Sequence, residues 1–403
     1  VLAVAGTAPV VLYHFNQTSL VGVAANLLLV PLVGFVAVPL GLVSAAAAFF
    51  SGPVAAAGFG LSLQIIHWAL MVVAWFASLP FAAFHAVTPA LPEIILYYLA
   101  GWALFNRRTA TTAPLILAVV LAAAVGDGLY WSYQRFWHHD LRLTAVDVGQ
   151  GTSTLLEFPG GGVMLVDGGG FSDNRVFDMG QRVVAPLLWR KKIASVDILA
   201  LSHPNADHLN GLIFIARHFH VRELWINGDI NTTWGYRELM TVCREQGIVV
   251  RTMDTRADAR LFGGVTVTVL HPPPGFVLPA ANDQSRCNDA SLVIKATFGE
   301  TAFLLTGDIM AGGERVLVQH QGSRLASTVL LAPHHGSRSS SSASLIDAVK
   351  PELVVVSAGA DNRFGFPHAE VVDRYRQAGC RVLCTCNRGA ILLFSDGHRI
   401  DCR

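Results

Sequence analysis

The fold of the carboxyl-terminal part is decided by Leu201-Ser202-His203-Pro204-Asn205-Ala206-Asp207-His208-Leu209-Asn210-Gly211. The apolar run that ends at Leu201 has the length and polar borders of a buried strand. Two imidazoles and a carboxylate follow on the loop after it, where rigid scaffolds present catalytic groups. His203, Asp207 and His208 are ligand types that divalent transition metals take. Taken alone, the motif fits a polar surface loop equally well.

Three further clusters of His and Asp follow predicted strands later in the chain. They are Thr306-Gly307-Asp308, Pro333-His334-His335-Gly336 and Pro367-His368. Four strand-end clusters of this kind are hard to explain as surface decoration. Together they favour a metal site at one edge of a sheet.

The charge of the chain divides it into two unlike parts. Residues 1 to 92 contain no Asp, Glu, Lys or Arg, and the first 134 residues carry only Glu93, Arg107, Arg108 and Asp127. The net charge of +1 over 403 residues therefore describes neither part. We expect a multi-helix transmembrane α domain over residues 1–137 and a soluble domain over residues 138–403.

The apolar part predicts several membrane segments. A membrane helix ends near Phe15, and full spans are expected at 53–79 and 114–130, with a shorter segment at 94–105. Residues 20–50 are interrupted by prolines and glycines, so we expect a broken or re-entrant helix pair there. The short loop with Arg107 and Arg108 is typical of the cytoplasmic side, which predicts an extracytoplasmic (periplasmic) soluble domain.

The soluble part opens with a glycine-punctuated run of strands and continues with alternating strands and helices. This order predicts an α/β sandwich of sheets flanked by helices. The serine run 337–344 is expected to be a flexible loop beside His334 and His335. Six cysteines lie in this part, and a disulfide such as Cys380 to Cys402 is one pairing that the sequence allows.

Five motifs in this order resemble the ComEC family of competence proteins, which carry DNA across the inner or cell membrane. They are Asp147-Val-Gly-Gln-Gly, Leu165-Val-Asp-Gly-Gly, Ser202-His-Pro-Asn-Ala-Asp-His, Leu305-Thr-Gly-Asp and His334-His-Gly-Ser. The resemblance implies competence-type helices followed by an αββα metallo-β-lactamase-like domain. It also implies that the amino-terminal part of the family is missing.

The resemblance assigns roles to individual residues. His203 takes the first metal site, Asp207 and His208 take the second, and Asp308 is the bridging carboxylate. The later pair supplies one further ligand, for which we favour His335. The remaining motif residues are expected around the site or as alternative ligands: Asp147, Asp167, His334 and His368.

Three departures from the family pattern bear on the metal. Asn205 stands where the wider fold usually has a second histidine, Thr152 where an acidic residue is common, and Asn288 near a further metal-binding histidine. The site is therefore short of imidazole and charge, and Mn²⁺ becomes at least as good a candidate as Zn²⁺. One or two ions, or a weakened or inactive site, remain open.

The function implied is DNA uptake, with the soluble domain a nuclease that degrades the strand that is not transported. Asp207 and His208 would act in catalysis, and single-stranded DNA, membrane lipid and other uptake proteins would be the partners. Basic residues that suit a phosphate backbone are Arg182, Arg190, Lys191, Lys192, Arg338 and Arg363. The alternatives are a membrane-anchored metallohydrolase of another substrate, or a catalytically weak fold that binds DNA.

Overall fold

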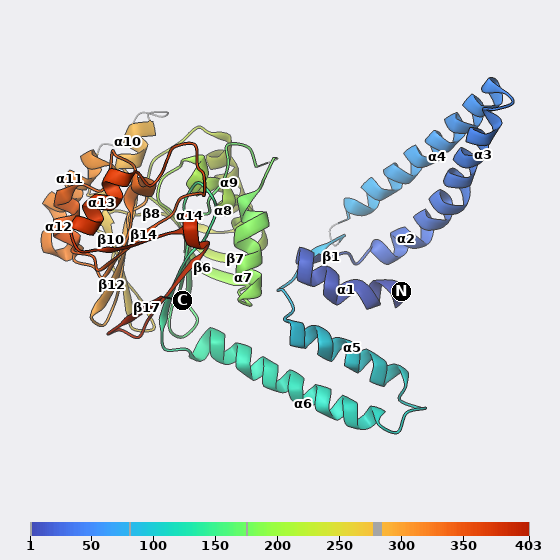
Figure 1. The fold of residues 1–403 in the computed structure, drawn as a ribbon, viewed down its shortest axis with the longest axis horizontal. Helices are drawn as coiled ribbons and strands as arrows, with labels where there is room; N and C mark the ends of the chain where they lie inside the picture. The colour runs from blue at the N-terminus through green and yellow to red at the C-terminus, as the bar shows by residue number, and fades with distance from the viewer. Residues whose placement is uncertain (1, 80–81, 175, 277–283, 403) are drawn as a thin grey trace. The chain divides into compact units, whose positions relative to one another are not determined.

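The computed structural model describes residues 2–79, 82–174, 176–276 and 284–402 (Figure 1). The chain forms two compact units, one up to Asp127 and one from Gly128 on. The division falls within helix α6, which runs from Ala113 to Ser132.

The first unit consists of apolar helices. Before α6 they are α1 (Leu2–Phe15), α2 (Gly22–Val30), α3 (Val38–Ala47), α4 (Gly52–Ala77) and α5 (Leu91–Phe105), with a short strand pair, β1 (Gln17–Thr18) and β2 (Phe84–His85). In the described part of the chain, three helices are long and apolar enough to cross a membrane: Gly22–Ala47, Gly52–Ala77 and Ala113–Trp137. The last two agree with the spans expected at 53–79 and 114–130.

The expectation of a broken or re-entrant helix pair at 20–50 is wrong. Helices α2 and α3 are joined by a π-helical segment, Pro31–Ala37, into one continuous helix. The Val38 N–H donates to Val33 O, five residues back. Proline has no N–H to give, and the wider turn supplies other donors to the carbonyls that it leaves free. The prolines therefore distort the helix without breaking it.

Helices α3 and α4 pack closely through small residues. A Cβ atom on Gly58 would lie 2.0 Å from Ser44 Oγ and 3.1 Å from Ser44 Cβ, so a larger residue would force Ser44 to move. Ser62 Oγ donates to Ala37 O at 2.9 Å across the same seam. Small residues and interhelical hydroxyl bonds are what hold membrane helices together, because lipid provides no hydrophobic drive between them.

The second unit contains two mixed sheets. One has the strand order β17-β16-β3-β4-β5-β6-β7-β8 and the other β15-β14-β13-β12-β11-β10-β9. The strands of the first are β3 (Leu141–Ala145), β4 (Thr154–Glu157), β5 (Val163–Val166), β6 (Ser195–Leu201), β7 (His220–Ile226), β8 (Val249–Thr252), β16 (Ile391–Ser395) and β17 (Ile400–Cys402). Those of the second are β9 (Arg260–Phe262), β10 (Val265–His271), β11 (Val293–Phe298), β12 (Thr301–Leu305), β13 (Val329–Leu331), β14 (Leu353–Val356) and β15 (Arg381–Cys384).

Helices cover the outer face of each sheet (Figure 1). The helical segments are η3 (Gly180–Val184), α7 (Ala185–Arg190), α8 (Ala206–His218), α9 (Trp234–Gln246), α10 (Gln284–Asp289), α11 (Ala311–Gln321), η4 (Gly322–Leu325), η5 (Pro333–Gly336), α12 (Ala343–Val349), α13 (Ala369–Gln377) and α14 (Thr385–Arg388). Three apolar layers result. Leu143 and Phe303 belong to the core between the sheets. Leu212 of α8 and Leu317 of α11 belong to the two outer cores, between each sheet and its helices. The predicted αββα sandwich is confirmed.

The sandwich brings the predicted clusters to one edge. Strands β5 and β6 run parallel, as do β12, β13 and β14, so the carboxyl ends within each set open on the same side. The loops of the two sheets meet where the Leu292 N–H donates to Ser202 O at 2.8 Å. Residues after β5, β6, β12 and β13 therefore converge.

The serine run 337–344 is not the flexible loop that was expected. Ser340 and Ser341 are buried, and the Glu314 carboxylate accepts from the Ser341 and Ser342 N–H groups. The Tyr375 hydroxyl donates to Ser341 Oγ at 2.8 Å. The buried Glu314 carboxylate fixes the loop because it accepts from two successive backbone N–H groups. The serine run itself gives no sign of this contact.

The cysteines also pair differently from the example given. Cys384 and Cys386 form a disulfide, whereas Cys380 and Cys402 are free. Cys380 lies just before β15 and Cys402 in β17, and these strands belong to different sheets. Cys384 and Cys386 are only two residues apart and lie at the turn that begins α14.

Candidate metal centre

The motif stretch makes a strand-to-helix turn. β6 ends at Leu201, His203 is fully buried in the turn, and Asn205 precedes the first residue of α8. Asp207 and His208 therefore lie in the first turn of that helix. A helix amino terminus favours negative charge, so the Asp207 carboxylate is stabilised where it stands.

Asp308 and His335 come from the other sheet. The turn after β12 passes through Gly307, where a Cβ atom would lie 2.8 Å from Ser202 Cβ and φ is +54°. His335 has a φ of +56° in the turn after β13, a conformation that a bulky side chain rarely adopts. Strained backbone of this kind concentrates at functional sites.

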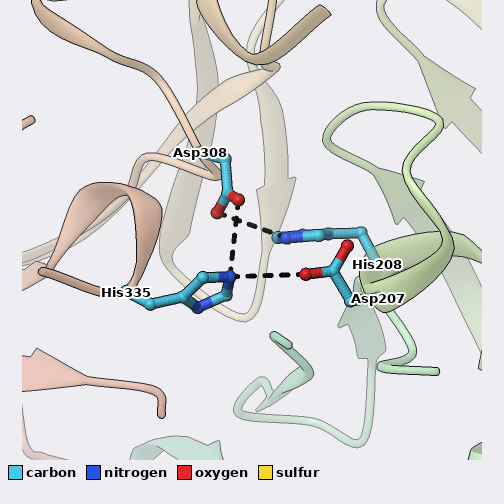
Figure 2. Close-up of side chains that lie close together, drawn as sticks. All are labelled: Asp207, His208, Asp308 and His335. Carbon is cyan, nitrogen blue, oxygen red and sulfur yellow. Dashed lines mark ion pairs between the residues drawn. The ribbon is translucent and has the colours of Figure 1, made fainter. Parts of the chain in front are cut away.

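Four side chains meet at the sheet edge (Figure 2). Each of Asp207, His208, Asp308 and His335 offers one ligand atom, and these atoms all lie within 4.8 Å of one another. His208 Nε2 is 3.2 Å from Asp308 Oδ1. His335 Nε2 is 3.4 Å from Asp308 Oδ2 and 3.6 Å from Asp207 Oδ2.

Hydrogen bonds to the far side of each ring set its orientation. His208 Nδ1 donates to Asp167 Oδ2 at 2.8 Å, and His335 Nδ1 donates to the Ser357 carbonyl at 2.9 Å. Ser202 Oγ donates to Asp167 Oδ2 at 2.8 Å and lies 3.0 Å from His203 Nδ1. Bonds of this type fix the tautomer and leave Nε2 as a ligand atom.

The residues fit a bound cation. Nε2 of His203, His208 and His335 and Oδ1 of Asp308 are buried and form no hydrogen bond within the described residues. Leaving a buried polar atom without a partner costs free energy, so four such atoms at one point favour a missing ligand. Imidazole nitrogen together with carboxylate oxygen suits a divalent transition metal.

Charges within the cluster are tightly coupled. Burial disfavours the charged form of His335, but Asp308 and Asp207 outweigh it and raise the pKa of His335 to about 10. Burial raises the pKa of Asp207, yet the ion pair with His335 and the charge of His208 lower it to about 2. Without metal, the two carboxylates therefore favour the protonated form of His335.

Comparison with protein families finds a match for each unit. Residues 1–111 match the competence protein family, and residues 146–279 match the metallo-β-lactamase superfamily. ComE operon protein 3 of Bacillus subtilis (strain 168) is 26% identical, covering 97% of this chain and 50% of that protein. Competence protein ComA of Neisseria gonorrhoeae is 27% identical, covering 94% and 48%.

The chain is similar to ComEC-family proteins, with a competence match followed by a metallo-β-lactamase match. It spans about half the length of the curated relatives it matches. Among solved structures, the metallo hydrolase Igni18 from Ignicoccus hospitalis is 14% identical with a TM-score of 0.39, covering 63% of this chain and 98% of that one. The family match and the apolar helices indicate a membrane protein, and the metallo-β-lactamase fold implies divalent metal binding.

The positions expected to form the first metal site of the ComEC family are occupied differently. His203 Nε2 is 4.0 Å from Asp308 Oδ2, at the border of the cluster. Asn205 Nδ2 donates to Asn288 Oδ1 at 2.8 Å, and Asn288 Nδ2 lies 3.4 Å from His334 Nε2. Two neutral amides therefore hold one another on this side of the site.

The residues expected around the site lie close to it. Asp167 accepts the hydrogen bond from His208 Nδ1. The exposed Asp147 accepts from the Gly149 N–H in a loop whose Thr152 N–H donates to Asp207 O. The His368 N–H donates to Gly336 O at 3.0 Å, next to His335. His334 Nε2 is 3.9 Å from Asp308 Oδ2.

The basic residues divide into two groups. Arg190 ends α7, and Lys191 and Lys192 follow it before the start of β6, at the opposite edge from the cluster. Lys191 pairs with Glu157 at 2.6 Å. Arg182 is exposed on η3. Arg338 and Arg363 lie in loops of the cluster edge itself, and Arg338 pairs with Glu370. The length of β6 separates Arg190, Lys191 and Lys192 from the cluster, although these residues are close to the motif in the sequence.

Sequence reasoning missed the residues that orient the rings. Ser202 links Asp167 to His203, and Ser357 supplies a backbone carbonyl to His335. Ser291 Oγ accepts from the Asp308 N–H at 3.1 Å. Serines of this kind are common in loops, and only the convergence of strand ends gives them a role.

Proposed function

We propose that the chain belongs to a membrane protein of DNA uptake and that its soluble domain is a metal-dependent phosphodiesterase. It would degrade one DNA strand while the other enters. The observation that supports this most strongly is the buried cluster of Asp207, His208, Asp308 and His335 with its unpartnered nitrogens. The competence match over residues 1–111 supports DNA as the substrate.

We expect a single ion, held by Asp207, His208, Asp308 and His335, with His203 at its border. Either Mn²⁺ or Zn²⁺ suits this set, because it combines two imidazoles with two carboxylates. When bound, a divalent cation lowers the pKa of a water to about 7 and neutralises charge on a phosphoryl group. One ion could contact all four residues, because their ligand atoms lie within 4.8 Å of one another.

The chain's own residues would handle the proton and position the substrate. Asp207 is the ligand whose side chain is most open, with 35% of its surface exposed, against 4% for Asp308. It is therefore the group that can accept a proton from water as the water oxygen attacks phosphorus. His208 and Asp308 stay buried and fix the geometry. One P–O bond forms and the opposite P–O bond breaks.

The proposed location is the inner or cell membrane, with the soluble domain on the extracytoplasmic side. Arg107 and Arg108 follow α5 in a short loop before α6, and such loops lie on the cytoplasmic side. One further helix would then deliver the soluble domain across the membrane. Single-stranded DNA, membrane lipid and other uptake proteins are the partners proposed.

One observation favours a second candidate, a weak or inactive metal site on a fold that binds DNA. Asn205 and Asn288 bond to each other where an active two-metal site would have ligands. A neutral amide supplies neither charge nor imidazole. In this case the domain would hold DNA without cleaving it.

The test is cleavage of a labelled single strand by the purified chain in detergent, with Mn²⁺, Zn²⁺ or a chelator. We expect cleavage with metal and none with chelator. The Asp207→Ala chain controls for contaminating nucleases, and Asp347→Ala, at an exposed position on α12, serves as the matched control. Binding without metal-dependent cleavage in the wild type would favour the second candidate.

A further inference from the structure

A ladder of planar side chains leads from the metal cluster to the surface. The Phe366 ring stacks on the His335 ring with centroids 6.0 Å apart and 28° between planes. The Phe364 ring stacks on Phe366 at 5.4 Å and 15°. The Arg363 guanidinium lies over the Phe364 ring, 4.8 Å from its centroid. The ladder therefore begins at a cluster side chain and ends in a planar cation.

The loop between β14 and α13 holds this ladder in place. Asn362 Nδ2 donates to Gly359 O at 2.9 Å and to Phe366 O at 2.6 Å, and Asn362 Oδ1 accepts from the Phe366 N–H at 3.0 Å. One amide thus closes the loop and leaves residues 363–365 as its tip. The ladder is formed before any ligand arrives.

The loop is also fitted against the cluster. A Cβ atom on Gly336, next to His335, would lie 2.7 Å from Pro367 Cβ. At the other end, a Cβ atom on Gly359 would lie 3.1 Å from Gln150 N. Both ends therefore touch segments of the site, and a shift of the loop tip relative to His335 is resisted.

The outer rungs are open to solvent. Phe364 is 46% exposed, and Arg363 is exposed without an ion-pair partner among the described carboxylates. Arg338, in contrast, is paired with Glu370. An exposed aromatic ring beside an exposed guanidinium offers a surface on which a flat ligand can stack. The cation–π contact holds the Arg363 guanidinium over the Phe364 ring.

We propose that Arg363 and Phe364 form a stacking platform for an unpaired nucleobase of the strand whose phosphodiester lies at the metal cluster. The proposal rests on the proposed function. An aromatic face accepts any base, and the guanidinium adds attraction for both the base and a neighbouring phosphate. The platform would therefore be tolerant of sequence.

The platform also selects single strands. Bases in a duplex are stacked on one another and paired, so their faces are not available to a protein side chain without unstacking them. For an unpaired base, the free-energy cost of stacking on the platform is much lower. The soluble domain would thus act on a strand that is already separated from its complement.

The experiment measures binding of a short labelled single strand to the full chain in detergent, with chelator present so that no turnover occurs. A second probe is the same strand with abasic residues, which keeps the phosphates and removes the bases. Phe364→Ala and Phe364→Leu should weaken binding of the intact strand about tenfold. Phe364→Trp should restore it, and the wild type and the three Phe364 variants should bind the abasic strand equally.

Arg363→Ala should weaken binding of both strands, more for the intact one. Arg376→Ala, an exposed arginine at the far end of α13, is its matched control. Equal binding of the intact strand by wild type and Phe364→Ala, or an equal loss on both strands, would overturn the platform. Metal-dependent cleavage is measured separately, so loss of the nuclease proposal leaves this result interpretable.

Discussion

His208 Nδ1 lies 2.8 Å from Asp167 Oδ2, and both side chains are fully buried. This contact turns His208 Nε2 toward Asp308. Asp167 also accepts from the Ser202 N–H and hydroxyl groups, and Ser202 Oγ lies 3.0 Å from His203 Nδ1, so one carboxylate orders His208 directly and His203 through Ser202. The metal centre depends on a residue that would not itself bind metal.

Asp167→Asn should lower metal affinity by about 10–100-fold, because an amide no longer fixes the His208 tautomer. Titration of the purified chain with Zn²⁺ against a competing chelator measures it. Asp197→Asn is the control: Asp197 accepts from the Val163 N–H, at the end of β6 remote from the cluster. Unchanged affinity in Asp167→Asn would separate Asp167 from the metal centre.

Metal binding near pH 7 should release about two protons. Asp308 and Asp167 raise the pKa of His208 above its ordinary value despite burial, and the pKa of His335 is raised to about 10. Both rings must lose a proton to ligate, so affinity should rise with pH. Calorimetry in buffers of different ionisation enthalpy reports the protons, and a binding enthalpy independent of buffer would contradict the assignment.

The same shifts make the stability of the metal-free chain depend on pH. A histidine with a raised pKa stabilises the folded state below its ordinary value of 6.5, and His335 loses this contribution as pH rises toward about 10. Chelated protein should therefore unfold more easily at pH 9 than at pH 6. His335→Gln should flatten that difference in thermal unfolding.

Asn205 should set the choice of metal. Asn205→His would place an imidazole next to His203 and tighten Zn²⁺ binding more than Mn²⁺ binding, whereas Asn205→Asp should favour Mn²⁺. Both changes break the bond from Asn205 to Asn288, so Asn288→Ala controls for that loss alone. If the ratio of the two affinities is the same in all forms, Asn205 is not a ligand position.

The orientation of the soluble domain is testable in intact cells. Ser323 is exposed on η4, which makes Ser323→Cys a suitable labelling site, whereas Ser340 is buried by its bond to Pro333 O. A membrane-impermeant thiol reagent should label Ser323→Cys above the parent chain. Labelling only after permeabilisation would place the domain on the cytoplasmic side.

Much of the architecture could be predicted from local patterns. The apolar runs before His203, Asp308 and His335 are strands because their residues fill the space between two sheets, and strand length limits where the loops begin. Histidine and aspartate at the ends of such strands are unusual enough to indicate a site. Three of the four predicted loops, those after β6, β12 and β13, supply the side chains that lie together in the cluster, whereas His368 is not among them.

What could not be predicted depends on contacts between distant segments. Glu314 fixes the serine run from a helix of another part of the chain, and Ser357 orients His335 from the next strand. The π-helical segment Pro31–Ala37 compensates for the backbone hydrogen bonds that the prolines cannot donate. Amino-acid composition does not show whether a helix will compensate in this way or break. The stacking of Phe364 on Phe366 requires a loop closed by Asn362.

The most direct measurement is anomalous X-ray scattering from crystals of the chain grown with Mn²⁺ and, separately, with Zn²⁺. We predict one strong peak bounded by Asp207, His208, Asp308 and His335, and its loss in Asp308→Asn. A peak elsewhere with this cluster empty, or none at saturating metal, would contradict the assignment of this edge as the metal centre.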